Sequence, residues 1–375
     1  MPEEITVQDG LAPYHFAGMI YNPSKGALNQ QTQRLLLIGK YDQEEAAEPL
    51  KQGLQQITSS NRIADFYPNK DSQIVKMLEI SFDANPMVER YAIALSSEQT
   101  IQDALNMLPE QQFTQIASGF NSKEDLKLVN DELAKRWDHT IQIDGHYFTA
   151  IKGDVTEVKN TYTENESLLN DLAHVTVMAI SDSQLDPAVW AASLAAVNAK
   201  YVSKPYLPYT SLEIPLLRRL NVLPATEYKL AERNLLLSYG ISTHIVESDK
   251  AKIDRLVTMH SKDKSYRDLN KKQILSYLRY DFVKFLKTMF PRCALSKDDT
   301  QADGDVVTPK SARDLAIARH MRWKQEKYVQ DPEGSFKNLV NVRVDENDGE
   351  TLRFFLPVQL MGQLRRTITT IAFTP

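Results

Sequence analysis

Residues 337–375 read KNLVNVRVDENDGETLRFFLPVQLMGQLRRTITTIAFTP and close the chain in segments with the pattern of β-strands. Apolar and polar side chains alternate in residues 337–344 and again in residues 351–356. The acidic run between them, residues 345–350, contains a glycine and favours a reversal of direction, so the two segments are expected to form a hairpin. The final run, residues 367–373, is rich in β-branched side chains.

A strand pattern at a chain terminus is unusual, because most termini are polar and frayed. Near the other end, residues 14–21 form an apolar and aromatic run, and the polar residues 22–34 follow it as a linker. We therefore expect extended β-strand arms at both termini. At the N-terminal end the alternative is a strand that folds back on its own domain.

The body of the chain alternates strand and helix patterns. Residues 35–39, LLLIG, are typical of a strand covered on both faces. Asp71, Asn121 and Asp186 are expected to cap helices whose apolar residues recur at helical spacing. This alternation predicts an α/β body with a layered, mixed sheet that is substantially parallel. Long helices followed by the hairpin predict a C-terminal α+β domain over residues 266–366.

These patterns divide the chain into five predicted segments. They are an N-terminal arm and tether, an α/β body, a connecting and sheet segment, a C-terminal α+β domain and a C-terminal strand arm, over residues 1–34, 35–200, 201–265, 266–366 and 367–375.

Composition limits the classes of protein that the chain can belong to. Of its 375 residues, 42% are hydrophobic and 25% charged, as in globular proteins with a sizeable core. The net charge of -5 argues against a bulk nucleic-acid binder. Cys293 is the only cysteine, so we expect neither an internal disulfide nor a cysteine-based zinc site. The sequence has no long apolar run, so no membrane insertion is expected.

The sequence contains no clear constellation of catalytic or metal-binding residues. Gly39 and Lys40 follow a strand, but Tyr41 stands where a phosphate-binding loop needs Ser or Thr. Residues 299–305 resemble part of a calcium loop, yet Lys310 stands where that loop needs Glu. The histidines are scattered without the spacing of metal ligands. We therefore expect no catalysis, no cofactor and no metal site, with an α/β enzyme or ligand-binding protein as the alternative.

One charged pattern indicates a surface for a partner. Basic side chains recur at helical spacing on the last long helix, which is expected to run from Thr308 or Ser311 to about Val329, and only Ile317 interrupts them. The members of this basic stripe are Lys310, Arg313, His320, Lys324 and Lys327. Such stripes are usually solvated helix faces. In an acidic protein, a one-sided basic helix is also suited to an acidic partner.

Several segments, in their order along the chain, resemble the tail sheath proteins of contractile phages, in particular the Mu-like group. Residues 231–237, AERNLLL, and residues 240–243, GIST, are similar to that family's TERNxLLxxGIST stretch. Residues 275–281, LSYLRYD, resemble its long-helix signature. Shorter similarities lie at residues 142–146, 174–178, 290–292, 307–309, 355–357 and 363–365. The resemblance covers roughly residues 35–375 and is most specific in the later half.

This resemblance implies a structural subunit that polymerises as hexameric rings around an inner tube and contracts to drive the tube through a host envelope. Its implied partners are further copies in a helical stack, the inner tube protein, and baseplate and tail terminator proteins, without nucleic acid. The implied location is the tail of a virion, after assembly in the host bacterial cytoplasm. The alternative is the sheath of a phage-derived bacteriocin or injection particle.

The resemblance also implies that subunits exchange terminal strands with neighbouring sheets. From the charge pattern, we further hypothesise that the basic stripe faces the tube. The residues expected in strand pairing between subunits are Tyr14, Phe16, Ile20, Val340, Val342, Leu352, Phe354, Ile368, Ile371 and Phe373. Pairing at a sheet edge supplies backbone hydrogen bonds for affinity and alternating side chains for specificity.

Overall fold

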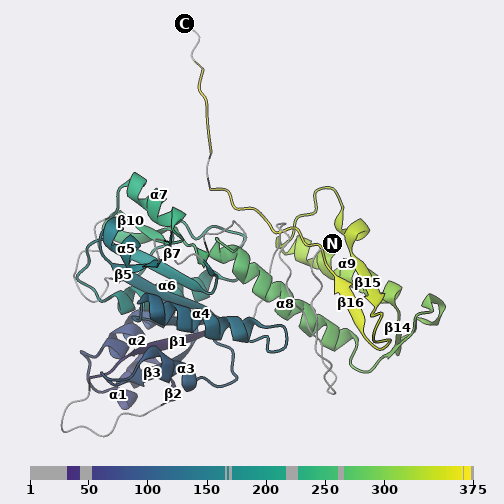
Figure 1. Ribbon diagram of the computed structural model, residues 1–375, viewed down its shortest axis with the longest axis horizontal. Coiled ribbons are helices and arrows are strands. Elements are labelled where there is room, and N and C mark those ends of the chain that lie inside the picture. Colours follow the sequence, from purple (N-terminus) through teal and green to yellow (C-terminus); the bar gives the residue numbers. More distant parts are fainter. Residues whose placement is uncertain are drawn as a thin grey trace. The chain divides into compact units, whose positions relative to one another are not determined.

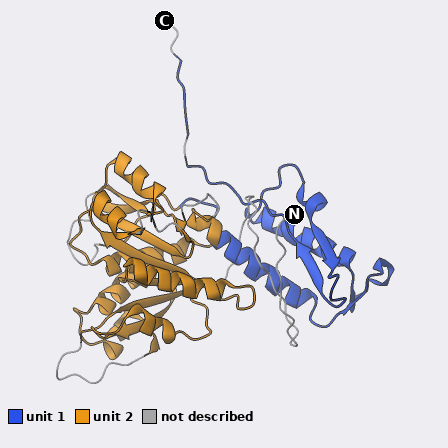
Figure 2. Ribbon diagram, viewed as in Figure 1, with its two compact units in different colours: residues 1–30, 204–208, 273–375 blue, residues 31–203, 209–272 orange. Residues whose placement is uncertain are grey.

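The computed structural model describes residues 32–42, 53–164, 167–168, 171–216, 227–260, 266–365 and 367–372. The chain folds as two compact units, which Figure 2 distinguishes by colour. Unit 2 holds residues 31–203 and 209–272, whereas unit 1 holds residues 1–30, 204–208 and 273–375. The predicted division into arms, body and C-terminal domain remains a prediction. The predicted N-terminal strand, with Tyr14, Phe16 and Ile20, lies outside the described residues.

Unit 2 is built on a six-stranded mixed sheet with the strand order β2-β3-β1-β4-β5-β9 (Figure 1). Neighbouring strands run parallel, except that β2 pairs antiparallel with β3. The strands are β1 (Arg34–Lys40), β2 (Leu54–Gln56), β3 (Glu89–Leu95), β4 (Gln115–Ser118), β5 (His146–Lys152) and β9 (Val175–Ile180). The predicted α/β body with a mixed sheet is therefore confirmed.

Strand β1 lies inside the sheet, between β3 and β4, and divides the core of unit 2 in two. Leu35 and Leu37 belong to one hydrophobic cluster, and Leu36 and Ile38 belong to another. Successive side chains of a strand point to opposite faces. A strand that is covered on both faces must therefore be apolar at every position, which explains the LLLI run.

Helices cover both faces of this sheet. Helices α2 (Gln73–Ala84) and α6 (Pro187–Tyr201) contribute to the cluster of Leu35, whereas α3 (Ile101–Asn106) and α4 (Lys123–Trp137) contribute to that of Leu36. Every residue of α6 from 188 to 199 is buried. Its sequence there, AVWAASLAAVNA, has no polar face, as expected for a helix that is enclosed on all sides.

Two helices begin one residue later than the predicted caps require. The N-cap of α2 is Ser72 instead of Asp71, and the N-cap of α4 is Ser122 instead of Asn121. The Ser122 hydroxyl accepts a hydrogen bond from the backbone N–H of Asp125 at 3.2 Å. Adjacent Asp, Asn and Ser residues have similar cap preferences, so the sequence alone does not rank them.

The remaining elements of unit 2 are short. The antiparallel hairpin of β10 (Thr243–Glu247) and β11 (Lys250–Arg255) turns at Ser248 and Asp249, whose φ angles of 52° and 57° fit a two-residue turn of type I′. The others are α1 (Ile63–Phe66), α5 (Val155–Thr161), β6 (Thr163–Glu164), β7 (Ser167–Leu168), β8 (Asp171–Leu172), α7 (Leu230–Ser238) and β12 (Met259–His260).

Unit 1 combines helices with short strands, in line with the α+β character predicted for this part of the chain. It contains α8 (Leu269–Met289) from residue 273 onward, and then β13 (Ala294–Leu295), β14 (Val306–Val307), α9 (Pro309–Gln325), α10 (Phe336–Leu339), β15 (Asn341–Val344) and β16 (Leu352–Phe355). Two expectations were wrong. Residues 337–339 belong to a helical turn, and the last long helix ends at Gln325 instead of near Val329.

A buried carboxylate joins α8 to α9. Asp281 on α8 accepts hydrogen bonds from Arg319 Nε at 2.6 Å, from Trp323 Nε1 at 2.7 Å and from the Tyr277 hydroxyl at 3.0 Å. A second N–H of Arg319 also donates to it. Because Asp281 is only 3% exposed, these donors replace the water that a carboxylate would otherwise require.

Candidate functional site

The predicted hairpin in unit 1 forms, with Val342 opposite Phe354 and Val344 opposite Leu352. The N–H of Asp345 donates to the carbonyl of Thr351 at 2.8 Å, which makes these two residues a hydrogen-bonded pair. Hydrogen-bonded and non-hydrogen-bonded pairs alternate along an antiparallel ladder. The backbone groups of Val342 and Val344 therefore point away from β16, and those of Leu352 and Phe354 point away from β15.

Both edges of this hairpin lack a strand partner among the residues that the structure describes. Within the described residues, no backbone hydrogen bond reaches the outward N–H and C=O groups of Val342, Val344, Leu352 or Phe354. Phe355, at the end of β16, is 37% exposed. Unpaired strand edges are templates for another strand. The hairpin thus offers two acceptor edges.

Packing and a polar turn hold the hairpin in place. Phe354 packs edge-on against Phe282 of α8, with ring centroids 5.4 Å apart. In the turn, Asp345 accepts a hydrogen bond from the backbone N–H of Asn347 at 2.8 Å and is also paired with Arg353. These two contacts, the first being the larger, hold the pKa of the Asp345 carboxyl below its usual value. The outward edges of β15 and β16 are therefore already held in place in the single subunit.

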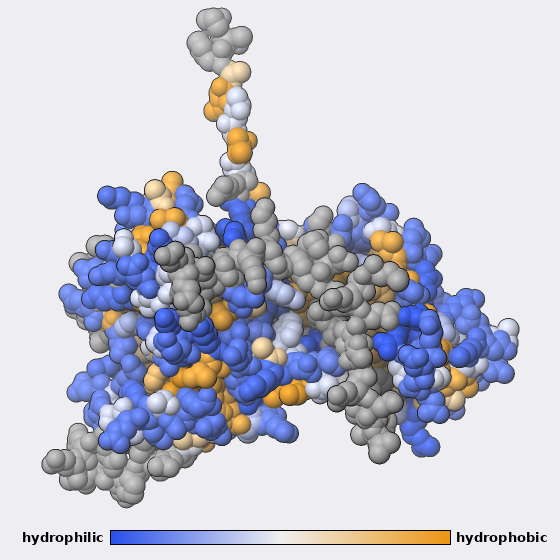
Figure 3. All heavy atoms as spheres, viewed as in Figure 1, coloured by the Kyte–Doolittle hydropathy of each residue, from blue (hydrophilic) through white to orange (hydrophobic). Residues whose placement is uncertain are grey.

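The C-terminal segment is exposed along its described length. Residues 367–372 form no strand within this chain, and Ile368 and Ile371 are 95% and 89% exposed. Figure 3 shows that this segment presents hydrophobic side chains on its surface. Phe373 lies outside the described residues. A β-branched segment without burial in its own chain is suited to add to a sheet elsewhere.

The basic stripe on α9 is less uniform than its spacing predicted. Lys310 and Lys324 are exposed, and Lys324 Nζ donates to the carbonyl of Asp331 at 3.1 Å. Arg313 is half-buried, and its Nε donates to the carbonyl of Val340 at 3.2 Å. The Arg313 guanidinium also donates to the carbonyl of Lys337. Arg313 therefore fixes the entry to β15, so only part of its charge faces solvent.

His320 is a core residue and does not share the exposed face. Its ring is 3% exposed and stacks on Phe336 of α10, with centroids 3.6 Å apart and an interplanar angle of 1°. Burial lowers the pKa of His320 to about 4, against a smaller opposing effect from Asp331. The imidazole is therefore neutral near pH 7 and adds no charge to the stripe.

Lys327 lies beyond the helix and ends it. Its φ is 61°, and its N–H donates to the carbonyl of Lys324 at 3.1 Å, while the N–H of Tyr328 donates to that of Trp323 at 2.9 Å. This pair of bonds is the Schellman motif, in which a left-handed residue reverses the chain after a helix. Periodicity placed Lys327 on the helix face because sequence spacing does not show where this cap occurs.

The carboxyl edge of the sheet in unit 2 is the usual place for a ligand in such folds. Strand order reverses around β1, and ligands of open α/β sheets bind at that switch point. Here Lys40 Nζ donates to the carbonyls of Ser96 and Ser97 at 2.8 and 2.9 Å. Gln73 bridges the Lys40 N–H and the Asp186 carboxylate at 3.0 and 2.9 Å. The chain's own side chains thus fill the switch point.

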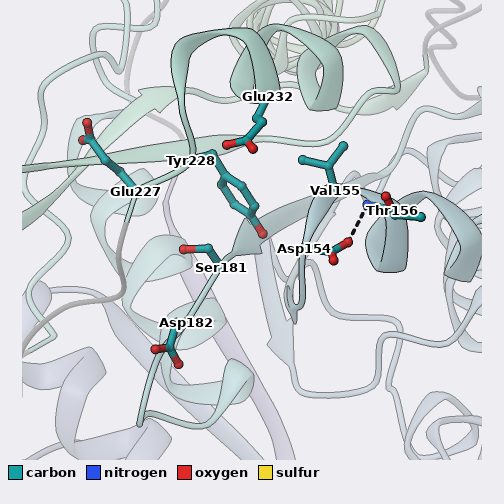
Figure 4. A pocket seen from close by; sticks show the side chains of 8 residues that line it. All are labelled: Asp154, Val155, Thr156, Ser181, Asp182, Glu227, Tyr228 and Glu232. Atoms are coloured by element: carbon teal, nitrogen blue, oxygen red, sulfur yellow. Dashed lines mark hydrogen bonds between the residues drawn. The ribbon is translucent and has the colours of Figure 1, made fainter.

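An open pocket of about 420 Å³ lies at the carboxyl ends of β5 and β9. Figure 4 shows the acidic side chains of Asp154, Asp182, Glu227 and Glu232 around Tyr228. Tyr228 donates to the carbonyl of Gly153, and burial followed by the nearby carboxylates raises the pKa of its hydroxyl. Among the described residues that line the pocket there is no histidine, lysine or arginine, so this lining disfavours anionic ligands.

Neither a metal site nor a membrane-spanning helix is found in the described ranges. No group of three or more His, Cys, Asp or Glu side chains within them is placed to hold a metal ion. None of the helices built from these residues has both the length and the apolar character needed to cross a membrane.

A buried cluster of basic side chains in unit 2 was not predicted. Lys272, at the start of α8, places its Nζ 2.6 Å from His174 Nδ1 and 3.4 Å from His146 Nδ1, and it lies over the Trp137 ring. Burial, followed by the charge of Lys272, holds the pKa of His146 well below its ordinary value. Helical spacing is the sequence feature that could have predicted the burial of Lys272. It lies three residues from Leu269 and three from Leu275, which are both buried.

Acid should destabilise the fold through its buried histidines. His244 is fully buried, and burial lowers the pKa of its ring to about 4, below the usual 6.5. The unfolded chain therefore binds the proton more readily, so this contribution to stability is complete above pH 6.5 and is lost as the pH falls toward 4. We expect the free energy of unfolding to fall by about 2 kcal/mol for His244 between pH 7 and pH 5.

Urea unfolding of the wild type and of His244→Gln at both pH values checks this expectation. The variant should lose this part of the pH dependence, whatever its stability at pH 7. Equal slopes against pH in the two proteins would rule out His244 as a source of acid sensitivity.

Comparison with known proteins finds similarity to tail sheath proteins. A family model described as "Phage tail sheath protein central domain" matches residues 95–259. The Mu-like prophage FluMu tail sheath protein of Haemophilus influenzae is 29% identical to this chain over 280 residues. That alignment covers 72% of this chain and 56% of the relative, so it spans little more than half of the relative's length.

Solved sheath structures have the same fold. The anti-feeding prophage helical sheath in its contracted state matches with a TM-score of 0.61 and 13% identity, over 98% of this chain and 99% of the other. The sheath complex of an extracellular contractile injection system matches with a TM-score of 0.58 and 10% identity, over 98% of both chains. The sheath tail protein of Desulfitobacterium hafniense matches at 0.59 and 10%, over 93% and 97%.

The family and relatives that match are sheath proteins, in agreement with the expectation that the chain is not an enzyme. The matched segment runs from the end of β3 to β12 and includes β4, β5 and β9 of the main sheet. Over residues 95–259, this chain is therefore similar to the central domain of phage tail sheath proteins.

Proposed function

We propose that this protein is a structural subunit of a contractile tail sheath. It polymerises as hexameric rings stacked around an inner tube, and contraction of the stack drives the tube through a host envelope. The observation that carries this proposal is the sheath central domain, together with the sheath relative that aligns over 72% of the chain. In this role the protein belongs to the tail of a virion and binds further copies, the tube protein, and baseplate and terminator proteins.

A second candidate is the sheath of an injection particle that is not a virion. It is favoured by the fold shared with the anti-feeding prophage sheath and with an extracellular contractile injection system. Both candidates assign the same mechanical role to the subunit, and they differ in what the particle delivers.

Neighbouring subunits hold one another by strand exchange in this proposal. The C-terminal segment, with Ile368, Ile371 and Phe373, adds to a hairpin edge of one neighbour, and the N-terminal strand adds to that of another. The two open edges of β15 and β16 support this arrangement, because they match the number of proposed donor strands. The segments between each donated strand and the rest of the subunit keep neighbours connected while the subunits reorient.

Electron microscopy of the concentrated protein in negative stain tests the proposal. Rings or tubes with a central lumen are expected. A protein that stays monomeric at every concentration, with and without a tube protein, would contradict it.

The exposed members of the basic stripe are proposed to face the tube. Exposed charge pairs are individually worth only about 0.2–1 kcal/mol, so they hold the tube through repetition around the ring and release it during contraction. Reversing both Lys310 and Lys324 to Glu should abolish co-sedimentation of sheath with tube at low salt, while sheath alone still polymerises. Arg313 and His320 are left unchanged because they pack within unit 1.

The matched control reverses Lys70 and Lys200, two exposed lysines of unit 2, which changes the net charge equally. The control should retain tube binding. If both double variants bind the tube as the wild type does, the tube-facing role of α9 is wrong.

A further inference from the structure

The exposed C-terminal segment leaves unit 1 at a small antiparallel bridge. Leu360 pairs with Val329, the N–H of Gln330 donates to the carbonyl of Gln359 at 3.1 Å, and Met361 N–H reaches the carbonyl of Tyr328 at 3.4 Å. Leu360 is 7% exposed, whereas Leu364 is 75% exposed. Among the described residues, Leu360 is thus the last buried one before the segment.

This bridge rests on a buried and hydrogen-bonded part of unit 1. Tyr328, which precedes Val329, is 1% exposed, and its ring stacks on Tyr277 of α8 with centroids 5.7 Å apart. The Tyr277 hydroxyl donates to Asp281, the carboxylate that also binds Arg319 and Trp323. A continuous set of contacts therefore connects Leu360 to α8 and α9.

The position of the bridge is mechanically significant, because the acceptor hairpin lies just before it in the chain. Strand β16 ends at Phe355, and only residues 356–359 separate it from Leu360. Beyond the bridge, the Gln363 side chain makes only long hydrogen bonds, at 3.4 Å, to the carbonyls of Pro205 and Leu207. Once these bonds and the bridge are lost, a pull on the C-terminal segment would act on the end of β16. Strands pulled from one end break their hydrogen bonds one at a time, so the hairpin would open at low force.

We propose that the Val329–Leu360 bridge is a strain-relief anchor that isolates the hairpin from tension in the C-terminal segment. The inference rests on the proposed function, in which one subunit donates its C-terminal segment to a neighbour and accepts a strand on its own hairpin. The anchor lets both connections bear load at once. Tension passes from Leu360 through Tyr328 and Tyr277 into the helices and bypasses β16.

Single-molecule pulling on the subunit tests the anchor without requiring assembly. One handle is attached to Cys293, the only cysteine, and the other to a peptide tag fused after Pro375. The wild type should resist until the bridge breaks, with the hairpin opening only afterwards. In Leu360→Ala, the first rupture should occur at a lower force and coincide with opening of the hairpin.

Val342→Ala is the matched control, because Val342 is also 7% exposed and belongs to the same unit, but lies off the proposed path. Both variants lose buried methyl groups, so the midpoint of urea unfolding should fall in both. Only Leu360→Ala should lower the force of the first rupture. An unchanged force in Leu360→Ala, or an equal drop in both variants, would overturn the anchor.

The outcome is separable from that of the proposed function. If subunits lacking residues 367–375 still formed tubes, the role of that segment in assembly would be wrong, whereas the pulling result on the single chain would stand. If those subunits failed to assemble and Leu360→Ala ruptured like the wild type, strand exchange would stand and the anchor would be wrong.

Discussion

Removal of residues 367–375 should leave a folded subunit that no longer forms rings or tubes. The described part of this segment buries nothing in its own chain, and Ile368 and Ile371 are almost fully exposed. The free energy of unfolding should therefore stay within about 0.5 kcal/mol of the wild type, as for surface changes in general. Assembly should be lost, because each subunit then lacks a strand that binds its neighbour.

The expected result combines two measurements on the same protein. Urea unfolding of the truncated subunit should coincide with that of the full chain, while sedimentation at high concentration should show only small species. Tubes of normal appearance from the truncated subunit would refute the role assigned to the segment.

Adjacent proline substitutions make the same test within the full-length chain. Backbone N–H groups of successive residues in a strand point to opposite sides. Thr369→Pro and Thr370→Pro therefore differ in whether the lost N–H faces the neighbour's hairpin, and only one of them should block assembly. Two variants that both assemble normally would argue against strand pairing, whereas two variants that both fail would indicate a strand bonded on both sides.

The second large effect concerns Asp281, whose replacement by alanine should lower the free energy of unfolding by about 3–5 kcal/mol. The substitution leaves the guanidinium of Arg319, the indole N–H of Trp323 and the hydroxyl of Tyr277 without their common acceptor. Breaking a buried ion pair by removing one partner is costly, because the remaining charge has neither water nor counter-charge.

Glu346→Ala is the matched control within unit 1. Glu346 pairs with Arg343 at 2.7 Å, but the Glu346 side chain is 82% exposed. Such a pair contributes about 0.2–1 kcal/mol at most. Thermal or urea unfolding of both variants measures the difference in their free energies of unfolding. A loss below about 1 kcal/mol for Asp281→Ala would show that this carboxylate does not stabilise the packing of α8 against α9.

The periodic parts of the fold could be predicted from the sequence, because periodicity reports burial directly. The LLLI run of β1 and the apolar sequence of α6 both indicate elements that are buried on all sides, and both elements are buried in this way. The hairpin of β15 and β16 was predicted for the same reason. Failures occurred where adjacent residues have similar cap preferences, as at the caps of α2 and α4.

The candidate surfaces were harder to predict than the fold. Spacing placed His320 and Lys327 on one exposed helix face, but stacking on Phe336 buries the first and the Schellman motif moves the second off the helix. Both outcomes depend on residues after the helix, which a periodic pattern within it does not contain. The open edges of the hairpin likewise follow from its hydrogen-bond register, which is a property of the folded chain.

In the proposed strand exchange, the hairpin edges also have a consequence for the polarity of a polymer. A subunit that donates a strand and accepts one behaves as a monomer with two unlike reactive groups. A chain of such monomers always ends in an unused donor at one extremity and an unused acceptor at the other. The two extremities of a tube are thus chemically different surfaces. A protein that stops growth at one extremity needs only to present a free strand, and a protein that starts growth at the other needs only an open edge.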